Sequence, residues 1–246
     1  MNMVQAIQAL GPIDMRNVRR DPMLKWMVYV PLFLGFVLRW GLPFLFDQIL
    51  AWFDFDLTLY IPLLMSMMVM LIPMIYGSVV GFLLLDQRDD HTIEALQVTP
   101  LSLRGYFSYR ISVPVLLGLV GNMVMLPLSG LCDLSLGGML LVSLASAGLT
   151  PIYALFYAGF AQNKVQGFAL MKLSGMFFMP VLAAYFVSGP ARWFFGILPP
   201  FWPMQLYWTL AFLNFWQTLL LLVAGFILQG VYLVAMLRYF TKRLEK

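Results

Sequence analysis

The chain has 246 residues, of which 62% are hydrophobic and 11% are charged, and its formal net charge is +4. Soluble domains carry about 25% charged residues, so this composition excludes a water-facing globule and indicates a protein dissolved mainly in lipid. The length suits about six membrane-spanning helices with short loops, and we expect a single transmembrane domain over residues 1–246, in the plasma (inner) membrane.

The first 20 residues predict an amphipathic helix lying in the membrane interface. Apolar residues recur at helical spacing and are accompanied by the cations Arg16, Arg19 and Arg20. Basic side chains beside an apolar face favour the boundary between lipid and water. Gly11-Pro12 predicts a break within the segment. An ordinary polar lead-in to the first span is the alternative interpretation.

Six apolar segments are long enough to cross a bilayer. The first begins after Asp21-Pro22, where aspartate is a good N-cap and proline suits the first turn. Residues 189–215 are apolar but contain four prolines, which predicts short re-entrant helices dipping into the outer leaflet between spans 5 and 6. The expected spans are Met23–Phe46, Leu59–Leu85, Tyr106–Leu131, Met139–Phe160, Phe168–Val187 and Trp216–Met236.

Orientation follows the basic residues, which gather in the segments that face the cytoplasm when the N-terminus is inside. The opposite side holds one such residue, Arg192, in addition to acidic residues. These acidic residues are Asp47, Asp54, Asp56 and Asp133. With an even number of crossings, both termini and the loop over residues 86–104 are expected to be cytoplasmic.

That loop contains the densest cluster of charge in the chain, Asp86–Glu94. Asp89 or Asp90 can N-cap a short helix, and Thr99-Pro100 ends it because the residue before proline avoids helical dihedrals. The pattern predicts a short cytoplasmic helix between spans 2 and 3, parallel to the membrane. So many charges in an apolar chain indicate a docking site for a soluble partner, although a solvated loop without a partner is the alternative.

The segment Leu85–Ser102, with the sequence LDQRDDHTIEALQVTPLS, resembles the cytoplasmic coupling loop of ABC-2-type permeases, the membrane subunits of many ATP-binding-cassette exporters. The family pattern is a charged cluster, then Gly-Thr-Leu-Glu, then Thr-Pro-Leu-Ser. Here His91 stands in place of the commoner glycine and Ile93 in place of leucine. The interfacial helix, six spans and outer helices agree with the same family layout.

The resemblance implies a permease that moves an apolar or amphipathic drug, lipid or peptide out of the cell, driven by a separate ATP-binding subunit. ATP and Mg would be bound by that subunit and no cofactor by this chain. The chain would form a homodimer, or a heterodimer with a related permease, and would bind no nucleic acid. The residues implied in docking the ATP-binding subunit are Arg88, Asp89, Asp90, His91, Thr92, Glu94, Thr99 and Pro100.

Four residues within the spans are candidates for a substrate path. Arg39 lies in the first span, where snorkelling to outer headgroups or pairing with Asp47 is the alternative role. Met67 and Met70 belong to a methionine-rich second span. Its methionines suit a cleft that binds varied apolar substrates or, alternatively, fill gaps against neighbouring helices. Asn122 in the third span contacts a ligand or, alternatively, makes an interhelical hydrogen bond.

The sequence contains few of the residues and motifs that enzymes use for catalysis. His91 is its one histidine, no His/Cys cluster predicts a metal site, and no phosphate-binding GxxxxGK[ST] loop is present. An intramembrane enzyme is therefore disfavoured. An ion-coupled secondary transporter would need carboxylates along its path, whereas the clear acidic residues lie outside the expected spans. A non-transporting scaffold or immunity subunit that keeps the docking loop is a further alternative.

Overall fold

The structure is a computed structural model that describes residues 3–89 and 103–244. The described residues form helices, turns and short connections and contain no strand. The segments long and apolar enough to cross a membrane number six: Pro22–Phe53, Leu57–Asp89, Ser108–Ser129, Leu136–Phe160, Lys164–Phe186 and Phe215–Arg243. The predicted all-α fold with six spans is therefore confirmed.

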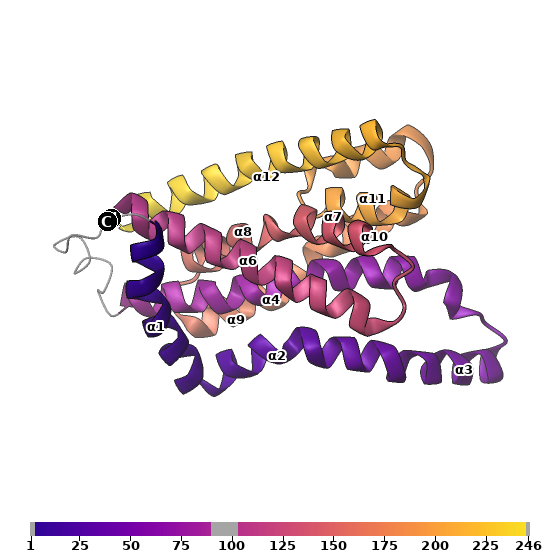
Figure 1. The fold of residues 1–246 in the computed structure, drawn as a ribbon, viewed down its shortest axis with the longest axis horizontal. Coiled ribbons are helices and arrows are strands. Elements are labelled where there is room, and N and C mark those ends of the chain that lie inside the picture. Colours follow the sequence, from indigo (N-terminus) through magenta and orange to yellow (C-terminus); the bar gives the residue numbers. More distant parts are fainter. Residues whose placement is uncertain (1–2, 90–102, 245–246) are drawn as a thin grey trace.

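Helix α4 (Ile61–Asp89) forms the centre of the bundle (Figure 1). It packs against α8 (Leu149–Phe160), α6 (Leu103–Ser129) and α2 (Pro22–Phe36). Most of its side chains are buried, whereas α2 and α12 (Phe215–Leu244) lie on the flanks and expose long apolar faces. A helix that is apolar on all sides is expected at such a central position.

The contact between α4 and α8 depends on two glycines. A Cβ atom on Gly77 would lie 2.6 Å from Tyr153 Cβ and 2.8 Å from the carbonyl oxygen of Thr150. A Cβ atom on Gly81 would lie 2.9 Å from the carbonyl oxygen of Ala154. Small residues four apart let two helix backbones approach closely in a membrane, so the central pair of helices is packed nearly backbone to backbone.

The first span is longer than predicted. Beyond Phe36 the chain passes through a π-helical turn, Val37–Gly41, into α3 (Leu42–Phe53), so the expected end at Phe46 is wrong. Asp47 remains on the helix, and the helix stops at Asp54, whose φ of 49° is left-handed. One exposed carboxylate does not end an otherwise apolar helix, whereas a left-handed residue does.

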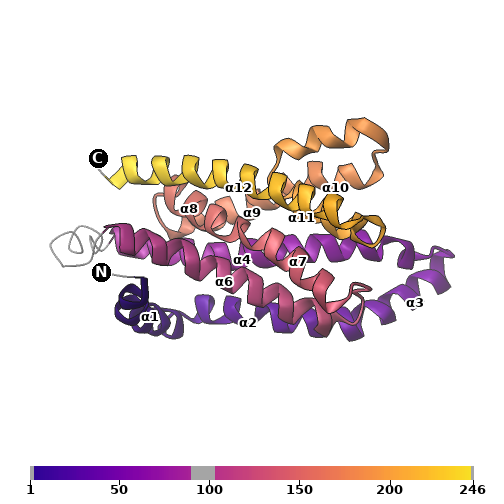
Figure 2. The same ribbon diagram turned by 45° about the horizontal axis from the view of Figure 1, so that its top comes forward.

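Helix α1 (Met3–Arg20) is continuous, so the break predicted at Gly11-Pro12 is wrong. Proline removes one backbone hydrogen bond and strains the preceding turn, but α1 also packs against α2 and α6. These tertiary contacts hold the helix through Pro12. Helix α1 lies across the ends of the long helices, next to both chain termini (Figures 1 and 2).

The fourth and fifth spans are each built from two helices. The fourth contains α7 (Leu136–Ala147) and α8, and the fifth contains α9 (Lys164–Ser174), the 3-10 turn η3 (Gly175–Phe177) and α10 (Phe178–Phe186). A 3-10 turn, η2 (Leu57–Tyr60), precedes α4.

Short helices fill the segment between α10 and α12. They are η4 (Gly189–Ile197), α11 (Phe201–Thr209) and η5 (Leu210–Phe212). Helix α11 is largely buried and packs against α4, α7 and α12. Trp202 Nε1 donates to the carbonyl oxygen of Gly196 at 2.9 Å, and Tyr232 on α12 donates to that of Ile197 at 3.2 Å. The segment is thus fastened to the bundle, and its entry into the outer leaflet stays a prediction.

Candidate docking site

The predicted docking residues fall in two groups. Arg88 and Asp89 are described, at the last turn of α4, on the end of the bundle that also holds α1 and both termini (Figure 2). The others lie outside the described residues: Asp90, His91, Thr92, Glu94, Thr99 and Pro100. The structure describes the helix ends beside which the loop is attached. We call these helix ends, which belong to α1, α2, α4, α8 and α12, the platform.

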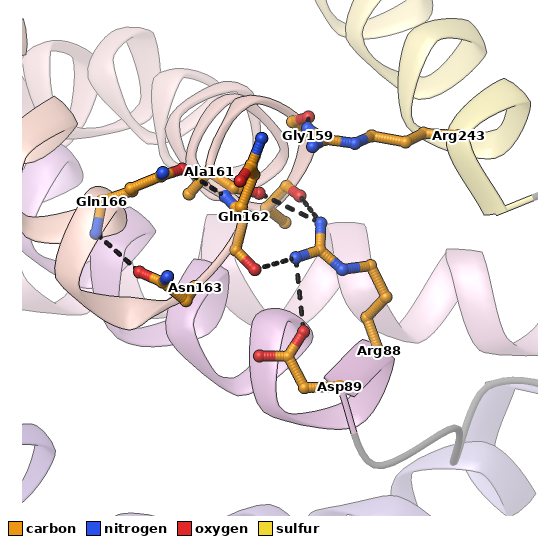
Figure 3. Close-up of polar contacts among 9 residues, drawn as sticks. Arg88, Asp89, Gly159, Ala161, Gln162, Asn163, Gln166 and Arg243 are labelled. Atoms are coloured by element: carbon orange, nitrogen blue, oxygen red, sulfur yellow. Dashed lines mark hydrogen bonds and ion pairs between the residues drawn. The ribbon is translucent and has the colours of Figure 1, made fainter. Parts of the chain in front are cut away.

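Arg88 joins the end of α4 to the end of α8 (Figure 3). Its Nη1 donates to the carbonyl oxygens of Ala158 and Ala161, both at 3.1 Å, and its Nη2 donates to that of Gln162 at 2.8 Å. The last carbonyl groups of a helix have no partner within the helix and carry partial negative charge. A planar guanidinium satisfies several of them at once, so Arg88 caps α8 from a neighbouring helix.

A second arginine reaches the same helix end from the far side of the bundle. Arg243, in the last turn of α12, donates from Nη1 to the carbonyl oxygen of Gly159 (Figure 3). The turn between α8 and α9 is closed by Asn163, whose side chain accepts from the backbone N–H of Gln166 at 3.0 Å. The end of α8 is therefore held to both α4 and α12, beside the attachment point of the loop.

Lys164 holds the beginnings and ends of three spans together. Its Nζ lies 3.0 Å from Asp21 Oδ2, at the start of α2, and 2.8 Å from Asp86 Oδ2, near the end of α4. Asp21 is also the predicted N-cap of α2 and accepts from the backbone N–H groups of Met23 and Leu24 at 3.0 and 3.2 Å. The predicted start of the first span is thus confirmed.

These contacts set the charge state of Asp21. Desolvation by burial raises the pKa of this carboxyl, but the hydrogen bond from Lys164, the backbone N–H groups and the positive charge of Lys164 lower it by more. The pKa of Asp21 therefore lies below its ordinary value, since each of these partners favours the ionised form.

A buried ion pair fixes α1 to α6, and the sequence analysis did not identify it. Arg110 Nη1 lies 2.8 Å from Asp14 Oδ2, and its Nη2 lies 3.2 Å from Asp14 Oδ1. Tyr109 donates its hydroxyl to the same carboxylate at 2.8 Å. The Arg110 side chain is 3% exposed and that of Asp14 is 12% exposed. A lone acid in the apolar stripe of a basic helix was the signal available in the sequence.

The four candidates for the substrate path do not share one surface. Asn122 is buried, and its Nδ2 donates to the carbonyl oxygen of Val69 at 3.0 Å and to Ser146 Oγ at 2.9 Å. Met70 is also buried, whereas Met67 is 36% exposed. Arg39 is exposed beside the ring of Trp40, and no ion pair joins it to Asp47. Their role on a substrate path stays a prediction.

Within residues 3–89 and 103–244, no group of three or more His, Cys, Asp or Glu side chains is arranged to hold a metal ion. The site is instead a set of helix ends joined by cations: Arg88 and Arg243 on α8, Lys164 between α2 and α4, and Arg110 beneath α1. These contacts join the ends of α2, α4, α8 and α12 and fix α1 to α6.

Six apolar spans with charge gathered at one end define a multi-pass membrane protein. A family model described as "Fluoroquinolones export permease protein Rv2686c-like" matches residues 14–237, and the chain belongs to this family. It is an export permease, a membrane transport protein.

Curated relatives give the same indication. Two proteins of Mycobacterium tuberculosis are each 29% identical to this chain over 208 residues, which cover 83% of this chain and 82% of the relative. They are named "Fluoroquinolones export permease protein MT2760", from strain CDC 1551 / Oshkosh, and "Fluoroquinolones export permease protein Rv2686c", from strain ATCC 25618 / H37Rv. No solved structure matches the chain significantly.

Proposed function

We propose that this export permease is the membrane subunit of an ABC exporter and moves an amphipathic small molecule out of the cell. A separate subunit binds ATP and Mg, docks on the loop at residues 86–104 and supplies the energy. The relatives' names point to fluoroquinolones as their cargo, and such planar amphipathic compounds are the substrate class that we propose for this chain.

The observation that carries the proposal is the attachment of Arg88. This residue belongs to the charged cluster Asp86–Glu94 and at the same time caps α8 through three carbonyl oxygens. A partner that pushes or pulls the loop therefore acts on α4 and α8 together. Because α8 is also held by Arg243, the same force reaches α12. Coupling between two sites requires an element of this kind that both sites bias.

The proposed orientation places both termini and this platform in the cytoplasm. Its support is the distribution of charge, since basic residues of α1, α9 and the end of α12 gather at the platform end, next to both termini. The positive-inside rule assigns that end to the cytoplasm. Fusion of a reporter enzyme that is active only outside the cytoplasm to Lys246 tests this orientation: the fusion should be inactive, and an active fusion would reverse the proposed topology.

Co-purification tests the docking step. An ATP-binding-cassette subunit, sought among the genes next to this one, is expressed together with the permease, and the complex is isolated through a tag on the permease. Glu94→Arg and Asp90→Arg should each abolish recovery of the ATPase, because charge pairs set the register of an interface. Asp133→Arg, an exposed acid in the turn between α6 and α7, is the matched control and should retain it. Full recovery with both loop variants would refute the docking role.

Transport in vesicles separates the proposal from its rivals. Purified permease and ATPase in sealed vesicles should move a fluoroquinolone only when ATP is present on the side of the ATPase. Transport driven by an ion gradient without ATP would instead identify a secondary transporter. Stable ATPase binding without any transport would identify a scaffold subunit. Chemical cross-linking of the same vesicles tests the proposed dimer, either of two copies or with a related permease.

A further inference from the structure

The strongest unassigned feature is a cavity of about 270 Å³ between α8, α12 and the connection before α11. Leu149, Ile152, Tyr153 and Phe156 of α8 form one wall, and Tyr232 and Met236 of α12 form the other. Leu198, Pro199 and Pro200 close it at one side. None of these residues was a candidate for the substrate path in the sequence.

The cavity lies between two contacts that α12 makes with the fourth span, one with α7 and one with α8. Toward one end, Gln229 Nε2 of α12 donates to the carbonyl oxygen of Ala145 at 2.8 Å. Toward the platform, the rings of Phe160 and Tyr239 stack with centroids 4.6 Å apart, next to the contact of Arg243 with α8. The residues of both walls lie between these contacts along the chain, so the two contacts border the cavity at either end.

The lining suits an aromatic ligand. Tyr153 already stacks on Tyr157 at 6.2 Å between centroids, and lies edge-on to Phe178 at 6.3 Å. Phe156 and Tyr232 add two further rings around the space. Offset and edge-to-face ring pairs are favourable at such separations, and ligand sites are typically apolar pockets with a few directed polar groups.

One polar group in this pocket lacks a partner. Tyr157 shares a hydrogen bond with Ser174 at 2.7 Å, and Tyr232 donates to Ile197. Tyr153 makes no hydrogen bond to any residue in the described part of the chain. A tyrosine hydroxyl is a hydrogen-bond donor, so the pocket favours a ring system that carries an oxygen or nitrogen acceptor.

The volume of the cavity distinguishes among the substrate classes. Ligand sites for small molecules enclose about 300 to 1,000 Å³, and a cavity of about 270 Å³ accepts one compact compound. It does not accept a whole phospholipid or a peptide. We propose that this cavity binds a planar, fused-ring aromatic compound with a hydrogen-bond acceptor directed at the Tyr153 hydroxyl. The inference rests on the proposed export function and places its cargo between α12 and α8, the helix whose end contacts both Arg88 and Arg243.

Equilibrium dialysis of norfloxacin against the purified permease in lipid nanodiscs, with no ATPase present, tests the proposal. The wild-type chain should bind saturably. Ile152→Trp fills the cavity and should weaken binding at least tenfold. Tyr153→Phe removes only the hydroxyl and should weaken it about fivefold, the effect of one net hydrogen bond. Leu220→Trp, on the exposed face of α12, is the matched control and should bind as the wild type does.

Met236→Trp fills the same space from the other wall and replaces Ile152→Trp if that variant fails to fold. Absence of saturable wild-type binding, or binding that both tryptophan variants leave unchanged, overturns the proposal. Binding of oleic acid in place of norfloxacin, sensitive to the same variants, also overturns it and makes the cavity a site for lipid chains. Because no ATPase is present, these outcomes are independent of the co-purification test of the export function.

Discussion

Asp14 of α1 and Arg110 of α6 form a two-pronged ion pair that joins residues 96 positions apart. Each carboxylate oxygen meets a different guanidinium nitrogen, and Tyr109 adds a third hydrogen bond. Bidentate pairs of this kind are strong and directional. Helix α1 is therefore a fixed part of the bundle and keeps a defined position beside the platform.

Removing one partner of this pair should destabilise the protein markedly. Asp14→Leu leaves Arg110 buried and uncompensated, with an expected loss of about 3–5 kcal/mol. The double variant Asp14→Leu/Arg110→Leu should recover much of that loss. Thermal unfolding in detergent measures both, with Asp133→Ala as an exposed control. A double variant as unstable as the sum of its single variants would show that the two residues act independently.

The lowered pKa of Asp21 predicts how stability depends on pH. A folded-state pKa below the ordinary value of 3.8 means that ionised Asp21 stabilises the fold at every pH above 3.8. The contribution falls away as the pH drops through the folded-state pKa. Asp21→Asn keeps an N-cap residue but removes the charge. Wild type should exceed this variant in thermal midpoint at neutral pH, and the difference should shrink as the pH falls below 3.8. A constant difference would contradict the prediction.

The backbone contact between α4 and α8 predicts intolerance of a single methyl group. In Gly77→Ala the new Cβ atom would meet Tyr153 and the backbone of Thr150 below 3.0 Å, so the helices must move apart. We expect a loss of about 1–3 kcal/mol. Gly230→Ala on α12, where a Cβ atom meets nothing within 4 Å, is the control and should be neutral. Equal thermal midpoints for the two variants would show that α4 and α8 are not in close contact.

Replacement of Arg88 should loosen the end of α8. Arg88→Ala frees three carbonyl oxygens, and hydrogen bonds to charged groups contribute about 1.5–3 kcal/mol. Arg88→Lys should recover only part of this, because an ammonium group lacks the planar fork. Limited proteolysis near Gln162 reports the opening of the turn between α8 and α9. Cleavage of both variants at the wild-type rate would rule out the capping role.

The interhelical bonds of Asn122 predict a small and local effect. Asn122→Leu removes the hydrogen bonds to Val69 and Ser146, and such bonds average about 0.6 kcal/mol in membrane proteins. We expect a slightly lower thermal midpoint and unchanged norfloxacin binding. A loss of binding with an unaltered midpoint would instead place Asn122 on the substrate path.

Apolar run length was sufficient to predict the number of spans and most of their positions. The N-cap at Asp21 was also evident, because that signal is local. The sequence analysis ended the first span at Phe46 because Asp47 is charged. The helix continues to Phe53, since one exposed carboxylate within an apolar segment does not end it. The same holds for Pro12, which tertiary contacts keep within α1.

The platform could be predicted only in part. The charged loop and Arg88 were prominent in the sequence, but the targets of Arg88 are backbone carbonyls of a helix some 70 residues later. Asp14 and Arg110 are likewise distant, and one sequence contains no signal for which cation meets which acid. The cavity is lined by α8, α12 and the connection before α11, and hydrophobic periodicity contains no information on how such distant segments pack together.

Lys164 has a consequence for biogenesis. Its two acids, Asp21 and Asp86, belong to the first and second spans, whereas the lysine starts the fifth. A ribosome that has released the early spans has therefore produced two neighbouring carboxylates before the cation that joins them exists. The two ion pairs therefore form only after the fifth span has been made, and until then water can solvate both partly exposed carboxylates.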